Sequence, residues 1–238
     1  MLFHTDKPET YREANPAITS AMSRELHHVA QPLTVLQGTL EIALVKERSQ
    51  AEYQSILHKV MEHSQKLADC FARVQRLAHF QQPATDIAEF SAAAMVRSVL
   101  ETVESHFIAR GINFEFSPTA EDDTCCDMVR ASEKRVTAAL ELVLSSLANA
   151  MPPHSKAVLL MDIKSQSVLL TLSIQQSLRD LALGCGLIAD LELAEAIATS
   201  AGAKLTCSPA TSCIMLGLPK ALPTLSLHHT ETLGYSHV

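Results

Sequence analysis

Two consecutive stretches of heptad spacing limit the possible fold of this chain more than any other feature. Between about residues 18 and 47, apolar residues recur at alternating intervals of four and three: Met22, Leu26, Val29, Leu33, Leu36, Leu40 and Ala43. A second series has the same intervals: Tyr53, Leu57, Val60, Ser64, Leu67, Phe71, Val74 and Ala78. This spacing is typical of helices packed in a bundle. Because only the polar residues 46–50 separate the two series, they predict an antiparallel helical hairpin.

The apolar faces of this hairpin are too wide for two helices to bury alone. Ile56, Cys70 and Leu77 add a second apolar line to the second helix. Pairing with a second copy would cover both faces in a four-helix bundle. We therefore expect a homodimer.

The rest of the chain predicts an α/β domain. We expect a helix over about 90–110 that stops at Gly111, and a strand over 113–117. A polar loop over 122–127 and a helix over about 132–150 follow. Strands over 156–163 and 167–174 are joined by a turn at 164–166, and a helix over about 187–200 precedes strands over 204–208 and 213–218. This order suggests helices on one face of a mixed sheet, so the fold class is α+β.

The expected division of the chain has four parts. Residues 1–17 form a flexible leader, 18–83 the hairpin, 84–222 the α/β domain and 223–238 a flexible tail. The first residues lack the basic and apolar regions of a signal peptide, and no apolar run is long enough to span a bilayer. The net charge of −7 argues against a nucleic-acid partner. We expect a cytoplasmic protein that binds neither nucleic acid nor membrane.

Cysteines and histidines outside the hairpin motif give no clear metal or redox site. No pair of the six cysteines has the C-x-x-C spacing of a zinc site. Cys125 and Cys126 are adjacent and are either a redox pair or two reduced thiols in a loop. Metal binding by His58 with His63, or by His228 with His229, is a remote alternative because neither spacing suits a ligand face. We expect no metal ion.

The segment Glu25-Leu26-His27-His28-Val29-Ala30-Gln31-Pro32-Leu33-Thr34 carries the most specific signal. It resembles the H-box of sensor histidine kinases in the form H-E-x-x-Q-P-L. In that family the phosphoacceptor histidine lies five residues before the proline, which is His27 here. The heptad agrees, because Leu26 occupies an a position and His27 therefore faces water as a titratable imidazole. The alternative is an ordinary solvated surface histidine.

The neighbours of His27 depart from the family pattern at one position. His28 stands where the family usually has a Glu or Asp that serves as the base for autophosphorylation. It either orients a phosphoryl group or has no role. Gln31 matches an amide that positions water for dephosphorylation, and its alternative is an exposed helical polar residue. Partner contact is expected on the same face at Thr34, Val35 and Gly38, since Gly38 has no side chain to keep another protein away.

The α/β order is similar to that of a histidine kinase ATPase domain whose nucleotide motifs are degenerate. Asn149 matches the asparagine that binds Mg²⁺ in active members, but Ser145 and Pro152 replace another asparagine and a lysine of that box. The adenine-binding D-x-G-x-G motif is absent, because the chain has Ile-Gln-Gln-Ser-Leu over 174–178. Gly184 and Gly186 are either remnants of the second glycine box or a simple turn. We expect that ATP no longer binds.

The resemblance implies a histidine phosphotransferase of two-component signalling. Such a protein relays a phosphoryl group between response-regulator receiver domains through phosphohistidine, here at His27. No cofactor is expected on this chain, since the Mg²⁺ would be bound by the partner receiver domain. Two alternatives remain: a divergent ATP-dependent sensor histidine kinase, and a non-catalytic scaffold or phosphatase module that binds regulators.

Overall fold

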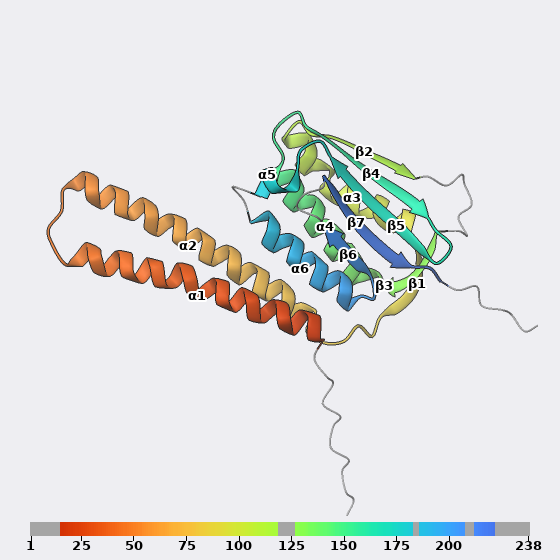
Figure 1. Ribbon diagram of the computed structural model, residues 1–238, viewed down its shortest axis with the longest axis horizontal. Helices are drawn as coiled ribbons and strands as arrows, with labels where there is room; N and C mark the ends of the chain where they lie inside the picture. The colour runs from red at the N-terminus through yellow and green to blue at the C-terminus, as the bar shows by residue number, and fades with distance from the viewer. Residues whose placement is uncertain (1–14, 119–126, 183–185, 208–211, 222–238) are drawn as a thin grey trace, which may run out of the picture.

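Two long antiparallel helices project from an α/β body (Figure 1). The computed structural model describes residues 15–118, 127–182, 186–207 and 212–221, without the side chains of residues 179 and 182. The helices are α1, Pro16–Leu44, and α2, Gln50–His79. Together they form the predicted hairpin.

Local capping determines where the hairpin helices begin. The side chain of Asn15 accepts a hydrogen bond from the Ala17 amide at 3.1 Å, and Pro16 occupies the first helical turn. Ser49 and Glu52 form a capping box at the start of α2, in which Glu52 accepts from the Ser49 amide at 2.8 Å. These hydrogen bonds from Ser49 lower the pKa of Glu52.

The α/β body contains a five-stranded sheet with the order β2-β4-β5-β7-β6. Only β2 and β4 are parallel, and the other neighbours are antiparallel. A separate two-stranded sheet pairs β1 with β3. The elements of the body are β1 Ile87–Ser91, α3 Ala92–Ala109, β2 Asn113–Pro118, β3 Met128–Ser132, α4 Glu133–Ala150, β4 Lys156–Ile163, β5 Ser167–Ile174, α5 Leu178–Ala182, α6 Leu187–Ser200, β6 Lys204–Cys207 and β7 Cys213–Pro219.

The three long helices of the body lie together on one side of the five-stranded sheet (Figure 1). Alternate residues of β5 are buried beneath them: Val168, Leu170, Leu172 and Ile174. The helices α3 and α6 end near glycines with positive φ, Gly111 at 64° and Gly202 at 84°, which is the usual way for a helix to end. The predicted fold class is confirmed: a helical hairpin followed by a mixed α/β domain.

Three short elements differ from the sequence prediction. The strands β1 and β3 were not predicted, because the predicted helices were placed over about 90–110 and 132–150 with no strand before either of them. Each strand has five residues and runs directly into the N-cap serine of the following helix, Ser91 or Ser132, so no break in the sequence marks it. The five-residue helix α5 was also missed, since one turn and a half has no periodicity to detect.

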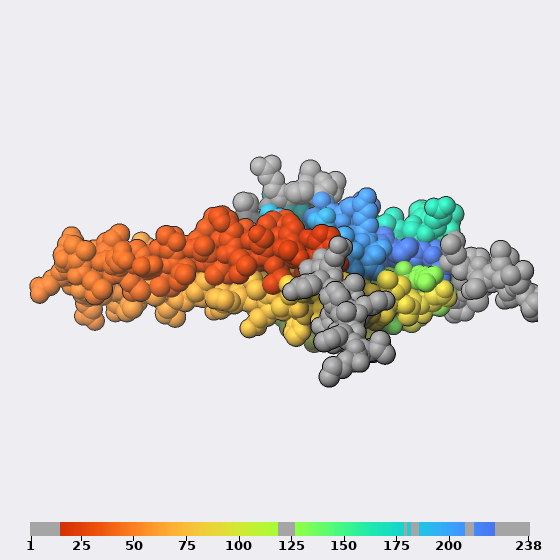
Figure 2. Space-filling model, turned by 90° about the horizontal axis from the view of Figure 1, so that it is seen from below, coloured from red at the N-terminus to blue at the C-terminus, as the bar shows by residue number. Residues whose placement is uncertain are grey.

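The base of the hairpin and the α/β body share one hydrophobic core. Ile18 and Ala21 of α1 and Leu77 of α2 are buried in the same cluster as Leu193 of α6. Figure 2 shows α1 and α6 in contact over the base of the hairpin, whereas the tip extends away from the body. The α/β body is therefore docked on the hairpin through α6.

Part of the predicted heptad line is exposed in the single chain. The residues of α1 that are buried are Ile18, Ala21, Glu25 and Ala43, whereas Leu26, Leu33 and Leu40 face outward. The large apolar residues of the hairpin that remain exposed are Leu26, Leu33, Val35, Leu40, Ile42, Leu44, Val45, Tyr53, Leu57, Met61 and Phe71. Among the described residues, no helix has the length and hydropathy needed to cross a membrane.

Candidate functional site

His27 lies on the exposed side of α1, as its heptad position predicts. Gln31, Thr34 and Val35 are exposed on the same side, and Gly38 follows one turn later. A Cβ atom on Gly38 would meet nothing within 4 Å. The hydroxyl of Thr34 donates to the carbonyl oxygen of Ala30 at 2.9 Å, which turns this side chain back onto its own helix. Their positions, 4, 7, 8 and 11 residues after His27, keep all five residues on one face of α1, where Gly38 is half-buried and the other four are exposed.

His28 has different surroundings from its neighbour His27. Its side chain is 42% exposed, and its Nδ1 atom lies 3.6 Å from Oε1 of Glu25, one turn earlier. Among the described contacts, His27 has no hydrogen bond or ion pair. Of the two adjacent imidazoles, His27 is therefore the one that is open to a partner.

Glu25 is a buried carboxylate on the inner side of the hairpin. Its Oε2 atom accepts a hydrogen bond from Nε of Arg73 on α2 at 2.8 Å, and the two side chains are 6% and 13% exposed. Burial alone would lower the pKa of Arg73. The hydrogen bond and the charge of Glu25 outweigh burial, with smaller contributions from Cys70 and Asp190, and the pKa of Arg73 is raised. The carboxylate of Glu25 thus favours the charged form of Arg73.

Arg73 also connects the hairpin to the α/β body. Its Nη1 atom lies 3.8 Å from Oδ1 of Asp190 in the first turn of α6. The other carboxylate oxygen of Asp190 accepts a hydrogen bond from the Ser146 hydroxyl on α4 at 2.7 Å. A connected set of polar groups thus runs from α1 through α2 and α6 to α4. Nearer the solvent, Arg24 and Glu192 form a second contact between α1 and α6, at 3.3 Å.

Glu25, Arg73 and Asp190 were not recognised as site residues from the sequence. The heptad gives one weak signal for the first two, because Arg73 follows Cys70 by three residues and precedes Leu77 by four on an inward-facing line. An arginine on such a line needs an acidic partner across the hairpin. Nothing in the sequence identifies Asp190 as its second partner.

The residues predicted for a vestigial nucleotide site are Asn149, Gly184 and Gly186. Asn149 is exposed in the last turn of α4. Gly186 is the N-cap of α6, and a Cβ atom there would lie 3.5 Å from Nη1 of Arg73. Gly184 lies outside the described residues. The amide oxygen of Gln176, in the stretch that replaces the adenine motif, is buried without a hydrogen-bond partner among the described residues.

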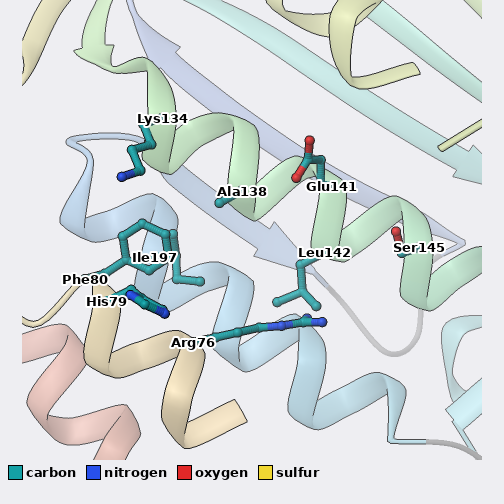
Figure 3. A pocket seen from close by; sticks show the side chains of 9 residues that line it. All are labelled: Arg76, His79, Phe80, Lys134, Ala138, Glu141, Leu142, Ser145 and Ile197. Carbon is teal, nitrogen blue, oxygen red and sulfur yellow. The ribbon is translucent and has the colours of Figure 1, made fainter. Parts of the chain in front are cut away.

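Two cavities lie where α2 ends, beside α4, and Figure 3 shows one of them. One has a volume of about 550 Å³ and the other of about 480 Å³. The first is lined by Arg76, His79 and Phe80 at the end of α2, by Lys134, Ala138, Glu141, Leu142 and Ser145 along α4, and by Ile197 of α6. Neither cavity is lined by Asn149, Gly186 or any residue of 174–178.

Within the described ranges, no group of three or more His, Cys, Asp or Glu side chains is placed to bind a metal ion. His58 and His63 are on α2, where His58 is exposed and His63 half-buried. His228, His229, Cys125 and Cys126 lie outside the described residues, so their two alternatives stay predictions.

Comparison with known proteins relates the chain to histidine kinases through structure alone. No family model matches the sequence, and no curated protein matches it significantly. Among solved structures, the chain is similar to the histidine kinase AdeS of Acinetobacter baumannii, with 19% identity and a TM-score of 0.50. That match covers 83% of this chain and 98% of AdeS.

A second similar structure is histidine kinase ThkA, solved in complex with the response regulator protein TrrA. Here the identity is 16% and the TM-score 0.53, over 86% of this chain and 62% of ThkA. At these identities the likeness concerns the fold. The chain has the fold of a histidine kinase hairpin followed by its ATPase-type domain.

Proposed function

We propose that this protein is a histidine phosphotransferase of two-component signalling, which carries a phosphoryl group on His27 between receiver domains of response regulators. The observation that carries the proposal is the position of His27. It is an exposed imidazole, five residues before Pro32, on the hairpin of a histidine kinase fold. Gln31, Thr34, Val35 and Gly38 continue its face and supply the surface on which a receiver would dock.

The proposed reaction is a direct transfer from a receiver phosphoaspartate. A neutral ring nitrogen of His27 attacks the phosphorus in line. A P–N bond forms as the P–O bond to the aspartate breaks, the carboxylate leaves, and the remaining ring N–H loses its proton to solvent. The reverse sequence on a second receiver regenerates His27. Such catalysis is mostly positioning and charge neutralisation, and the Mg²⁺ that neutralises the phosphoryl charge belongs to the receiver.

The degenerate nucleotide motifs favour a phosphotransferase over an ATP-dependent kinase. An adenine site needs an acceptor for the amino group and glycines that allow close approach, and residues 174–178 provide neither an aspartate nor a glycine. The amide oxygen of Gln176 has no hydrogen-bond partner among the described residues and is one acceptor, but Asn149 and Gly186 do not line the two cavities at the end of α2. The residues present therefore fit ATP poorly, and no step of the proposed reaction uses it.

The proposal includes two kinds of partner. The first is a receiver domain, which is supported by the complex of ThkA with a response regulator. The second is another copy of this chain, which is supported by the exposed apolar residues on the outer sides of both hairpin helices. Pairing of two hairpins would bury them in a four-helix bundle. Because response regulators act in the cytoplasm, we place the protein there.

The decisive experiment offers the purified protein two phosphoryl donors. Labelled ATP is added alone, and a phosphorylated receiver domain is added separately. We expect label to reach the wild type only from the receiver, and to be absent from the variant His27→Ala. A matched control is His58→Ala, which removes an exposed imidazole from α2 and should accept label at the wild-type rate.

The other outcomes have distinct meanings. Label from ATP alone would contradict the interpretation of the nucleotide site and make the protein a divergent histidine kinase. Absence of label from either donor, with the receiver still bound, would leave a regulator-binding scaffold. Label on His27→Ala would move the phosphoacceptor to another residue.

A further inference from the structure

A partly buried set of polar side chains joins the turn of α1 that carries His27 to the α/β body. We call Glu25, Arg73, Asp190 and Ser146 the Arg73 tie. Its contacts are the 2.8 Å hydrogen bond between Arg73 and Glu25, the 3.8 Å approach of Arg73 to Asp190, and the 2.7 Å hydrogen bond from Ser146 to Asp190. The four residues belong to four different helices, α1, α2, α6 and α4.

The hairpin and the α/β body do not need the charges of the Arg73 tie in order to pack against each other. Ile18, Leu77 and Leu193 already provide an apolar contact between them. Removing two carboxylates and a guanidinium from water is costly, and well-packed apolar residues often stabilise such a position at least as well. An ion pair, unlike apolar packing, depends on the direction of its hydrogen bonds. Arg73 can therefore contact both carboxylates only at one relative placement of the helices.

Because Glu25 lies close to the two histidines on α1, its ion pair with Arg73 also constrains their position. Glu25 lies two residues before His27 and three before His28, so all three belong to one turn of α1. One oxygen of Glu25 binds Arg73 and the other lies 3.6 Å from Nδ1 of His28. The same carboxylate thus fixes the rotation of this turn and lies beside His28, while His27 faces solvent.

We propose that the Arg73 tie is a positioning device for the phosphoacceptor, and that the degenerate α/β body acts through it as a brace for His27. This inference rests on the proposed phosphotransferase function. In-line transfer is sensitive to displacement, since an error of about 1 Å can slow a reaction about 100-fold. Arg73, Asp190 and Ser146 do not touch the reacting atoms, so they are positioning residues.

The first test measures transfer from a phosphorylated receiver to full-length variants. Arg73→Met keeps most of the side-chain volume and removes the charge, and Asp190→Asn keeps a hydrogen-bond acceptor for Ser146. We expect both to lower kcat at least tenfold and to leave KM within twofold of the wild type. Glu192→Gln is the matched control, because it breaks the exposed contact between α1 and α6, and it should change neither constant.

A double variant separates positioning from stability. Arg73→Met alone leaves Glu25 as an unpaired buried charge, and its Tm should fall. Glu25→Gln combined with Arg73→Met removes both charges, and the Tm should return toward the wild type while kcat stays low. Recovery of kcat together with Tm would show that the tie only stabilises the fold and would overturn the proposal.

Amide hydrogen exchange tests the tie without a phosphoryl donor. In Arg73→Met, exchange should increase in residues 22–31 of α1 and stay at the wild-type rate in the hairpin tip, residues 36–56. Unchanged exchange over residues 22–31 would overturn the proposed positioning role of the Arg73 tie. A wild type that accepts no phosphoryl group from a receiver would instead overturn the proposed function, and the two failures are thus distinguishable.

Discussion

Among single residues outside the candidate site, Arg135 makes several hydrogen bonds through one guanidinium group. It lies in the first turn of α4 and is buried. Its guanidinium donates to the carbonyl oxygen of Phe80 at 3.1 Å, to that of Gln82, and to the hydroxyl of Ser200 at 2.9 Å. The same group lies 5.5 Å from the ring centroid of Phe80. Burial lowers the pKa of Arg135, and the charge of Asp86 partly offsets this effect. Arg135 thereby fastens the segment that leaves α2 to the α/β body.

We expect Arg135→Met to lower the free energy of unfolding by about 1–3 kcal/mol, because carbonyl groups that it now pairs would stay without a donor. Urea denaturation at fixed protein concentration measures this difference. Arg97→Met, an exposed arginine of α3, should change stability by less than about 0.5 kcal/mol. Equal losses in the two variants would show that the contacts of Arg135 contribute nothing specific.

The exposed position of His27 could be predicted from the sequence, whereas the contacts of Glu25 could not. Exposure follows from helical periodicity, which is a local property that the apolar residues around His27 reveal. The partner of Glu25 is 48 residues away, and Ser146 is 44 residues from Asp190. Such pairs depend on how helices are placed against one another. A single sequence contains no local pattern for that placement.

At the scale of elements, α1 and α2 still expose apolar side chains after they have packed against each other. Leu33 and Leu40 on α1 and Leu57 and Met61 on α2 are exposed large apolar residues. Leu33, Leu40 and Leu57 belong to the heptad series, and Met61 lies one turn after Leu57. This arrangement is typical of a face that packs against another helical hairpin.

Substitution on this face should dissociate the proposed dimer. We expect the wild type to have a molar mass near twice the 25.9 kDa of one chain in light scattering coupled to size exclusion. Leu57→Glu introduces a charge that the apolar interface cannot solvate, and it should give a single-chain mass. Glu47→Gln, a change at the polar connection, should remain dimeric. A wild type with the mass of one chain would contradict the pairing.

The elements that were predicted correctly are those in which apolar and polar residues follow a regular local pattern. The strands β4 and β5 begin and end at the predicted residues, because each has eight residues that alternate in burial. The short strands β1 and β3 pair with each other across α3 and β2, so each depends on pairing with residues that are distant in sequence. They are defined by the folded domain rather than by local composition.

For the whole molecule, the continuous core means that hairpin base and α/β body stabilise each other. Leu77 of α2 is fully buried and contributes, with Ala21 and Leu193, to the lining of a small hollow between α1, α2 and α6. No boundary of polar residues separates this contact from the core beneath the sheet. The two parts should therefore unfold together.

Leu77→Ala should reduce the free energy of unfolding by about 2–5 kcal/mol, the usual cost of a cavity at a buried leucine. Hydrogen exchange along a urea series should show residues 18–30 and 136–144 losing protection at the same urea concentration. Ile108→Ala, at an exposed position of α3, should cost less than about 0.5 kcal/mol. Separate transitions for the two segments would contradict a shared core.

The docking of α6 on the hairpin also sets an order of events during synthesis. A ribosome releases α1 and α2 early, and α6 follows only after the first five strands of the chain, β1 to β5. At the usual rate of translation this interval lasts roughly 5–20 seconds. Throughout it, Ile18, Ala21 and Leu77 have no cover from Leu193, so the nascent hairpin is a substrate for chaperones or for a second nascent chain. Emergence of α6 ends this exposed period, because Leu193 then covers the base of the hairpin.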